Sequence, residues 1–400
     1  MTLRFIGRRM SDIIDHDVAA KASPRIRIKP PHSKNRQHVA SPLRSVQNTW
    51  TLNLSSIDTP LACATHWKGN FVLSRFALTS LWVVALTSSS ACEDDFTECD
   101  EPTAAALAVL PASISQANLF ADISTETLAD GVWAYKPRFE LWTDGATKRR
   151  WFSLPAGEMI DTSDEDQWRF PTGTTLFKEF SRDGVRVETR ILTKTGTEDD
   201  AWSASAYLWT QDQSDAFLAP EGGDDQMGTA HDVPSAADCA GCHDGRASRV
   251  LGFSALQLAW AAPEGFATVS TLKEAGILPD SVPEEIPLPA NEEDVQALGY
   301  LHANCSHCHN AARPVTDGLR CYDPEENFDF SLPSAGIDTV YDAPAYSTGV
   351  AQNVLTPGNA QASQMIQRLS NNGNRRMPAL GTEIIDAHGQ ALLTSWVNNL

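Results

Sequence analysis

Two copies of the pattern Cys-x-x-Cys-His lie in the second half of the chain, at Cys239–His243 and at Cys305–His309. Two cysteines at this spacing reach the two vinyl groups of one porphyrin, and the histidine that follows can ligate its iron. We therefore predict a covalently attached c-type haem at each motif. Cys239 and Cys242 would hold the first haem and Cys305 and Cys308 the second, with His243 and His309 as iron ligands.

Two other chemistries use the same cysteine spacing. The four cysteines can be paired into one tetrahedral zinc site of four thiolates. A thiol redox motif would need a βαβ setting and has no use for the following histidine. The residues downstream of the second motif favour haem.

Helices are predicted on both sides of the second motif. Asn291 suits an N-cap, and residues 291–304 combine an acidic first turn with apolar residues at helical spacing. A turn is expected at 356–359, a short helix at 363–369 and a closing helix at 383–398. Met377 lies between an Asn/Gly-rich loop and Pro378, and its thioether is a soft ligand suited to haem iron. Met377 is therefore the predicted sixth ligand opposite His309.

Residues 305–400 resemble a class I cytochrome c, on the haem motif, Met377-Pro-x-Leu-Gly381 and the terminal Leu-x-x-Trp-Val. The resemblance implies that His309 is the proximal ligand and Met377 the distal ligand. It also implies that a proline after the motif, here Pro314, offers its carbonyl to the proximal histidine.

The sixth ligand of the first haem stays open. Only 61 residues separate His243 from Cys305, and no methionine lies among them. The candidates are Met227, His231, His302 and His307. If none of these binds, an open position would admit peroxide or another small molecule. As ordinary residues, we expect His231 in a solvated loop, His302 on a helix face, His307 as a spacer and His388 on the surface of the last helix.

A β-rich region is predicted upstream of the first motif. Residues 185–191 carry β-branched side chains at every second position, and 151–154, 175–180 and 204–210 are rich in β-forming residues. Gly/Asp/Ser clusters at 181–184 and 196–200 separate them. Antiparallel strands in one sheet or sandwich are expected. Charged and aromatic residues can shape a pocket or simply cover a strand surface (Arg149, Arg150, Trp151, Trp168).

Further motifs extend the resemblance to residues 110–400. They are Phe139–Arg150, Trp168–Thr174, Glu188–Ile191, Ala206–Trp209, Pro234–His243 and Leu251–Phe253. Together they resemble a bacterial family of exported di-haem c-type cytochromes with a β-rich N-terminal portion. The resemblance implies two haems and does not name a substrate.

The N-terminal residues have a different character. Residues 1–70 hold 11 basic and 4 acidic side chains (net +7), whereas the rest holds 20 and 47 (31 − 11 and 51 − 4, net −27). Residues 71–92 look like a signal peptide that ends at Cys92, a candidate for lipid attachment. We expect 1–70 to lie outside the folded product, with translation starting near Val72 or Leu73. Cys99 is expected to pair with Cys321, or with Cys92 if lipidation fails.

The expected fold class is α+β. The expected order is an extension (1–70), a signal peptide (71–92), an acidic tether (93–110), a β-rich domain (111–235), the first haem segment (236–290) and a mainly α-helical cytochrome c domain (291–400). The predicted function is periplasmic electron transfer between redox partner proteins, through two haem irons. The acidic chain argues against nucleic-acid binding. Alternatives are a peroxidase-like enzyme with an open first haem and an electron outlet for a dehydrogenase.

Overall fold

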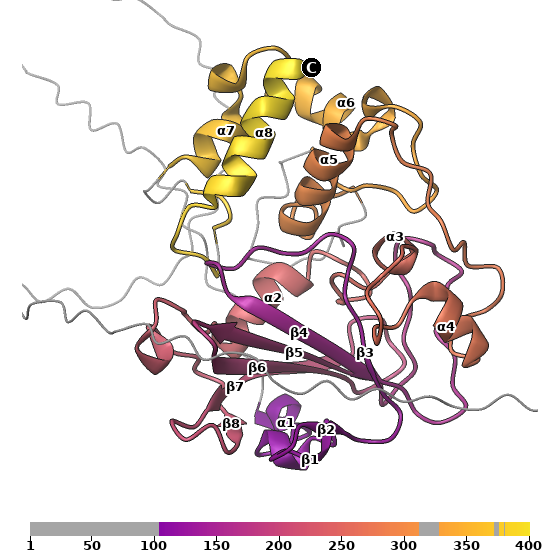
Figure 1. Ribbon diagram of the computed structural model, residues 1–400, viewed down its shortest axis with the longest axis vertical. Coiled ribbons are helices and arrows are strands. Elements are labelled where there is room, and N and C mark those ends of the chain that lie inside the picture. Colours follow the sequence, from indigo (N-terminus) through magenta and orange to yellow (C-terminus); the bar gives the residue numbers. More distant parts are fainter. Residues whose placement is uncertain (1–103, 312–327, 372–375, 380) are drawn as a thin grey trace, which may run out of the picture. The chain divides into compact units, whose positions relative to one another are not determined.

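The computed structural model describes residues 104–311, 328–371, 376–379 and 381–400 (Figure 1). The predicted extension, the signal peptide, Cys92, Cys99, Cys321 and Pro314 lie outside these ranges. The strands are β1 (Phe120–Asp122), β2 (Thr127–Leu128), β3 (Val132–Ala134), β4 (Thr147–Ser153), β5 (Thr175–Arg182), β6 (Val185–Lys194), β7 (Trp202–Trp209) and β8 (Ala216–Leu218).

Short helices precede and follow these strands. They are α1 (Ala104–Leu107), α2 (Ala236–His243), α3 (Ala255–Leu258), α4 (Val269–Glu274), α5 (Glu292–Asn304), α6 (Pro344–Ala351), α7 (Gln364–Leu369) and α8 (Ala387–Asn399). Short 3-10 turns lie at Ile114–Gln116, Gln226–Gly228, Val340–Asp342 and Ala360–Ala362. The fold is therefore mixed α+β, as predicted.

The principal sheet is an antiparallel meander in the order β3-β4-β5-β6-β7-β8, and β1 and β2 form a separate pair. The four predicted strands correspond to β4, β5, β6 and β7. Asp183 and Gly184 turn the chain between β5 and β6 with φ of 51° and 81°. Two successive positive φ values match the right-handed twist of the flanking strands, which is why Asp-Gly is favoured there. The sequence did not predict the short strands β1, β2, β3 and β8.

Each face of the sheet contributes to a different core. Trp151, Phe177, Ile191, Tyr207 and Trp209 alternate with their neighbours and pack toward the N-terminal residues. There Ser203 Oγ donates to the carbonyl of Ala106 at 2.7 Å, so residues 104–110 of the expected tether lie folded against β7. Figure 1 shows α1 on one face of the sheet and α2 on the other.

The second face shares one core with the helices. This core joins sheet residues (Phe152, Leu176 and Leu192) to helix residues (Leu298, Leu301, Leu393 and Trp396). At its centre, the Phe253 ring meets four other aromatic rings edge-on, with centroids 4.8–5.9 Å away (Tyr135, Phe152, Trp168 and Phe170). The strands and helices are therefore held together by common packing.

The helices predicted around the second motif are present. The Asn291 side chain accepts from the Glu293 amide, as an N-cap should. Helix α8 begins four residues later than predicted, because the amides of Glu383 and Ile384 donate to the Asp144 carboxylate at 3.0 and 2.9 Å. Asp386 then caps the helix. In the described ranges, no helix combines the length and apolar character that crossing a bilayer would require.

Phe253→Ala should destabilise the protein by about 3–5 kcal/mol, because it leaves a cavity among four aromatic rings. Chemical denaturation of the variant and the wild type measures the difference. The matched control is Phe217→Ala on β8, where the side chain is 53% exposed and little change is expected. Equal losses for the two variants would contradict a shared core centred on Phe253.

Candidate haem sites

The first motif occupies helix α2. Ser235 accepts a hydrogen bond from the Asp238 amide, and the Asp238 side chain accepts from the Ser235 amide, which forms a capping box. Cys239, Cys242 and His243 follow on the same short helix. The chain therefore presents both sulfurs and the imidazole from one rigid element.

The ring of His243 is oriented as an iron ligand requires. Its Nδ1 lies 2.5 Å from the carbonyl oxygen of Arg249. A carbonyl only accepts, so Nδ1 carries the proton and Nε2 keeps a free lone pair. Burial lowers the pKa of His243 to about 4, which keeps the ring neutral and able to ligate metal. No signal in the sequence indicates that Arg249 would supply this carbonyl.

A pocket lies between the first motif and the sheet, which we call the motif pocket. It encloses an empty volume of about 940 Å³, counting space open to solvent. Cys239, Cys242 and His243 line one side. The other side is formed by strand residues of β5, β6 and β7, both apolar and cationic (Leu176, Lys178, Arg190, Leu192 and Ala204). An apolar cavity with both cysteines and a prepared histidine fits a covalently bound haem.

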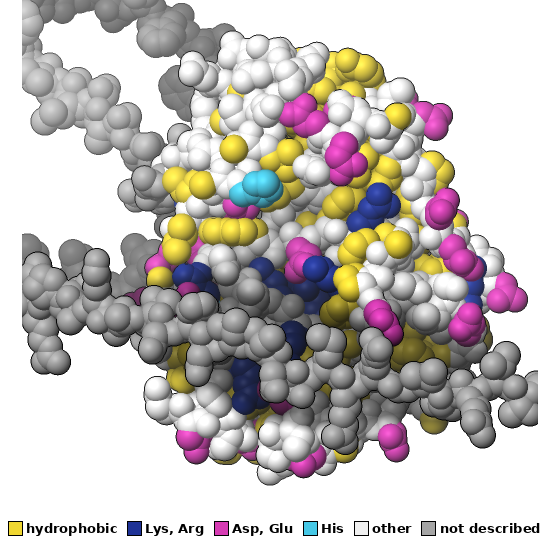
Figure 2. Space-filling view, in the orientation of Figure 1, with side chains coloured by type: hydrophobic (Ala, Val, Ile, Leu, Met, Phe, Trp, Pro, Cys, Tyr) yellow, Lys and Arg dark blue, Asp and Glu magenta, His cyan; other side chains and the backbone are white. Residues whose placement is uncertain are grey.

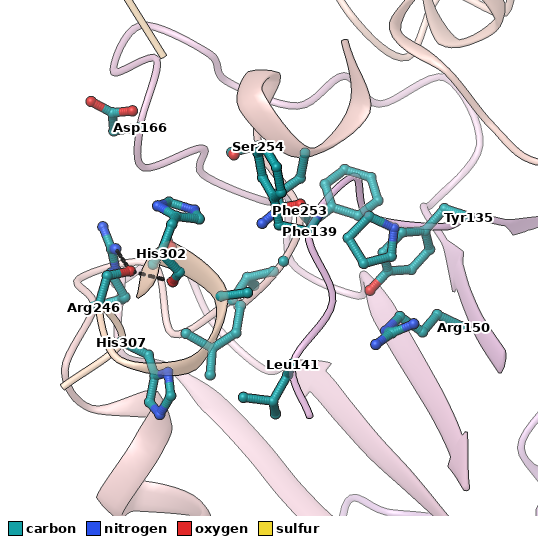
Figure 3. A pocket seen from close by; sticks show the side chains of 18 of the residues that line it. Tyr135, Phe139, Leu141, Arg150, Asp166, Arg246, Phe253, Ser254, His302 and His307 are labelled. Carbon is teal, nitrogen blue, oxygen red and sulfur yellow. Dashed lines mark hydrogen bonds between the residues drawn. The ribbon is translucent and has the colours of Figure 1, made fainter. Parts of the chain in front are cut away.

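A second pocket adjoins the motif pocket, and the two share lining residues (Tyr135, Leu141, Lys178, Val250, Leu251 and His307). We call it the adjoining pocket; its empty volume is about 770 Å³, again counting open space. Figure 3 shows His302, His307 and Arg246 at one end and Tyr135 and Arg150 at the other. Arg150 thus shapes a pocket, whereas Arg149 pairs with Glu126 and Glu179, and Trp151 and Trp168 are buried in the cores.

The second motif follows helix α5. Cys305 caps this helix, and the Cys305 carbonyl accepts from the amides of Cys308 (3.1 Å) and His309 (2.9 Å). The His309 ring stacks on Phe328 with centroids 4.3 Å apart and meets Phe330 edge-on at 6.0 Å. Burial raises the pKa of the Cys305 thiol to about 12.

The two motifs lie against each other. The thiol of Cys308 donates to the carbonyl of Gly241 at 3.5 Å. The buried side-chain amide of Asn310 donates to the carbonyl of Gly245 at 3.0 Å. Arg246, also buried, donates to Ser306 Oγ at 2.7 Å (Figure 3). The hydrogen bond between Cys308 and Cys242 holds the pKa of Cys242 well below its usual value. Residues 60 or more positions apart in sequence therefore form one structural unit.

The arrangement of the cysteines bears on the zinc alternative. Across the described ranges, no three His, Cys, Asp or Glu side chains converge as metal ligands would. The four motif cysteines therefore do not form the tetrahedral thiolate cluster that the zinc alternative requires. A haem takes only one histidine from each motif, so it does not need such a cluster.

The structure separates the candidates for the first haem's sixth ligand. His307 and His302 line the adjoining pocket, and His307 also lines the motif pocket. His302 Nδ1 accepts from the Leu332 amide at 3.1 Å. Met227 instead packs beside a small apolar cluster of Val187, Ala206 and Val233.

The expectation of a solvated loop for His231 is wrong. Its side chain is fully buried, and its Nε2 lies 2.8 Å from Glu188 Oε1. Burial favours the neutral acid, but Arg190 and His231 together keep the pKa of Glu188 below its usual value. His231 is buried because of the tertiary structure: strand β6 places the ionised carboxylate of Glu188 against the loop that carries His231. His388 is exposed on α8, as expected.

Met377 follows α7, where its amide donates to the carbonyl of Arg368 at 3.2 Å. Four residues further on, Gly381 lines the motif pocket. The loop that carries Met377 therefore leads from α7 toward the first motif. The pairing of Met377 with His309 stays a prediction.

No protein-family model matches this chain, and no curated protein or solved structure matches it either.

Gly245→Ala should separate the two motifs, because a Cβ there would lie 1.8 Å from the carbonyl oxygen of His307. We expect a loss of about 1–3 kcal/mol in unfolding free energy, typical of overpacking. Urea denaturation measures it. The control is Gly349→Ala in α6, where the nearest atom is Leu355 Cβ at 3.2 Å and the change should be small. An unaffected Gly245→Ala protein would contradict close contact of the motifs.

His302 should make folding stability depend on pH. Burial, followed by Arg246 and His307, lowers its pKa to about 3, so the unfolded chain binds a proton that the folded protein does not. Stability should therefore fall as the pH drops from about 6.5 toward 3, by up to about 1.4 kcal/mol per pH unit from this group. Denaturation of wild type and His302→Gln at pH 7 and pH 5 tests this. The surface variant His388→Gln should keep the wild-type slope, and an unchanged slope in His302→Gln would be the contrary result.

Proposed function

We propose that the chain is an exported di-haem c-type cytochrome that passes electrons between redox partner proteins. The contact between the two Cys-x-x-Cys-His motifs carries this proposal. Two haem sites in one rigid unit suit direct transfer between them. When bound, haem supplies a one-electron iron couple.

The residues of the chain have distinct roles in this proposal. Cys239 and Cys242 hold the first haem, and Cys305 and Cys308 hold the second. His243 ligates through Nε2 while the carbonyl of Arg249 holds its ring by Nδ1. His309 and Met377 are the proposed ligands of the second iron, a pair that raises the reduction potential.

The wider assignments belong to the same proposal. The β-rich part and the helices from 291 onward would correspond to a β domain and a class I cytochrome c domain of the di-haem family described above. The proposed location is the periplasm, with Cys92 as a possible lipid attachment site. The mature chain is acidic, which suits basic redox partners.

A second function is favoured by the adjoining pocket. Arg246, His302 and His307 line a cavity that adjoins the motif pocket, and such a cavity would admit a small molecule. A five-coordinate first haem would then act on peroxide with electrons from the second haem. A high-spin ferric spectrum of the purified protein would favour this function, and a wholly low-spin spectrum would favour electron transfer.

The intact mass of protein expressed with cytochrome maturation machinery tests the proposal. We expect two covalent haems, because both motifs present two cysteines and a histidine. Cys239→Ser/Cys242→Ser should retain one haem, and so should Cys305→Ser/Cys308→Ser. The control Met227→Leu should retain both. A wild-type protein with one haem would end the haem-to-haem scheme, and one with none would end the cytochrome proposal.

A further inference from the structure

Three cations stand in a row across the sheet. Arg150 on β4 is directly opposite Lys178 on β5, and Lys178 is directly opposite Arg190 on β6. Side chains at opposed positions of antiparallel strands point to the same face, and like charges there are destabilising. The row therefore costs stability unless a negative group neutralises it.

Among the residues that the structure describes, carboxylates pair with the two ends of the row. Arg150 pairs with Glu140 at 3.1 Å, and Arg190 pairs with Glu188 at 2.6 Å. Within the described part of the chain, no carboxylate lies within ion-pairing distance of Lys178. Its Nζ lies 4.9 Å from the centroid of the Phe180 ring. Burial, together with Arg150 and Arg190, lowers the pKa of Lys178 well below its usual value. Among the described residues, the central cation thus has no carboxylate of its own, and Glu188, which pairs with Arg190, acts on it only at a distance.

The row lies where the two pockets meet. Lys178 and Arg190 line the motif pocket, opposite the first motif's cysteines and His243. Lys178 and Arg150 line the adjoining pocket, where Figure 3 shows the Arg150 side chain beside Tyr135. Figure 2 shows Lys and Arg side chains gathered across the middle of this face, while Asp and Glu lie mostly toward its periphery. The positive charge is therefore directed into the cavity that would hold the first haem.

We propose that Lys178, flanked by Arg150 and Arg190, binds the propionate carboxylates of the haem that is held by Cys239 and Cys242. This inference rests on the proposed function. Thioether bonds use the vinyl groups of a haem, so its two propionates remain as the charged substituents. Charge-assisted hydrogen bonds from buried Lys and Arg are the strong partners for carboxylates. A bound carboxylate would also relieve the repulsion within the row.

Lys178→Gln tests the proposal, because it removes the central cation and breaks no ion pair of the described residues. The measurement is the reduction potential of the first haem as a function of pH, by spectroelectrochemical titration. Loss of a cation raises a carboxylate's pKa, so the propionates should bind protons about tenfold more tightly. The potential changes in a step around the pH at which the propionates titrate. This step should therefore move upward by about one pH unit. Lys178→Arg should keep the wild-type step.

The matched control is Lys148→Gln. Lys148 lies two residues before Arg150 on β4, and its amine donates to the carbonyl of Ala146 at 3.1 Å. It lines neither pocket but lies close enough to lower the pKa of Lys178, so its removal should shift the step much less than Lys178→Gln does. If Lys178→Gln fails to fold, Lys178→Met replaces it, because Met keeps an apolar stem beside Phe180. An unchanged step in the Lys178 variants, or an equal shift in Lys148→Gln, would overturn the proposal.

Two further measurements distinguish a failure of the propionate assignment from a failure of the proposed function. The potential of the first haem is assigned by comparison with Cys239→Ser/Cys242→Ser, and mass spectrometry counts the haems in every sample. Absence of the first haem from the wild type would mean that the proposed function fails. Calorimetric titration of the di-haem protein with formate tests for a free anion. Formate binding that disappears in Lys178→Gln would show that the row serves a diffusible anion, which would overturn the propionate assignment.

Discussion

The close contact between the segments after the two cysteine motifs is the constraint on which the proposed haem sites depend. Gly245 lies against the backbone of His307, and a side chain at this position would have no room. Asn310 and Arg246 complete the contact with buried hydrogen bonds to Gly245 and Ser306. Buried polar groups of this kind are costly when only one partner remains. The relative position of the two motifs is therefore set by backbone packing and satisfied polar groups.

The sheet forms one wall of the motif pocket. Its side chains point to two faces, of which one packs on the N-terminal helix and the other reaches the motif pocket. On the pocket side, apolar residues (Leu176, Leu192) stand beside cations (Lys178, Arg190). A wall of this composition can contact both the apolar ring and the charged edge of a porphyrin. The β-rich region thus has a direct place in the proposed first haem site.

The sequence predicted the elements that depend on local signals. The Asn291 cap, the Asp183-Gly184 turn and the strand β6 each reflect short-range chemistry, and each is present. Strand pairing is a long-range property, so the opposition of Arg150, Lys178 and Arg190 was beyond sequence reasoning. The same holds for His231, whose burial depends on Glu188 from a distant strand. The role of the Arg249 carbonyl likewise requires the three-dimensional path of the chain.

Asp144 gives the chain an order of assembly. This buried carboxylate lies just before β4, yet its hydrogen-bond donors are the amides of Glu383 and Ile384, some 240 positions later. Those donors come after both cysteine motifs in the chain, so the contact joins the start of β4 to a segment made later than the motifs. Until Glu383 and Ile384 are present, the Asp144 carboxylate stays hydrated. The segment before β4 cannot pack against the segment before α8 in that time. Both cysteine motifs therefore lie between the two ends of this contact, and the native structure around them is complete only after Glu383 and Ile384 have been made.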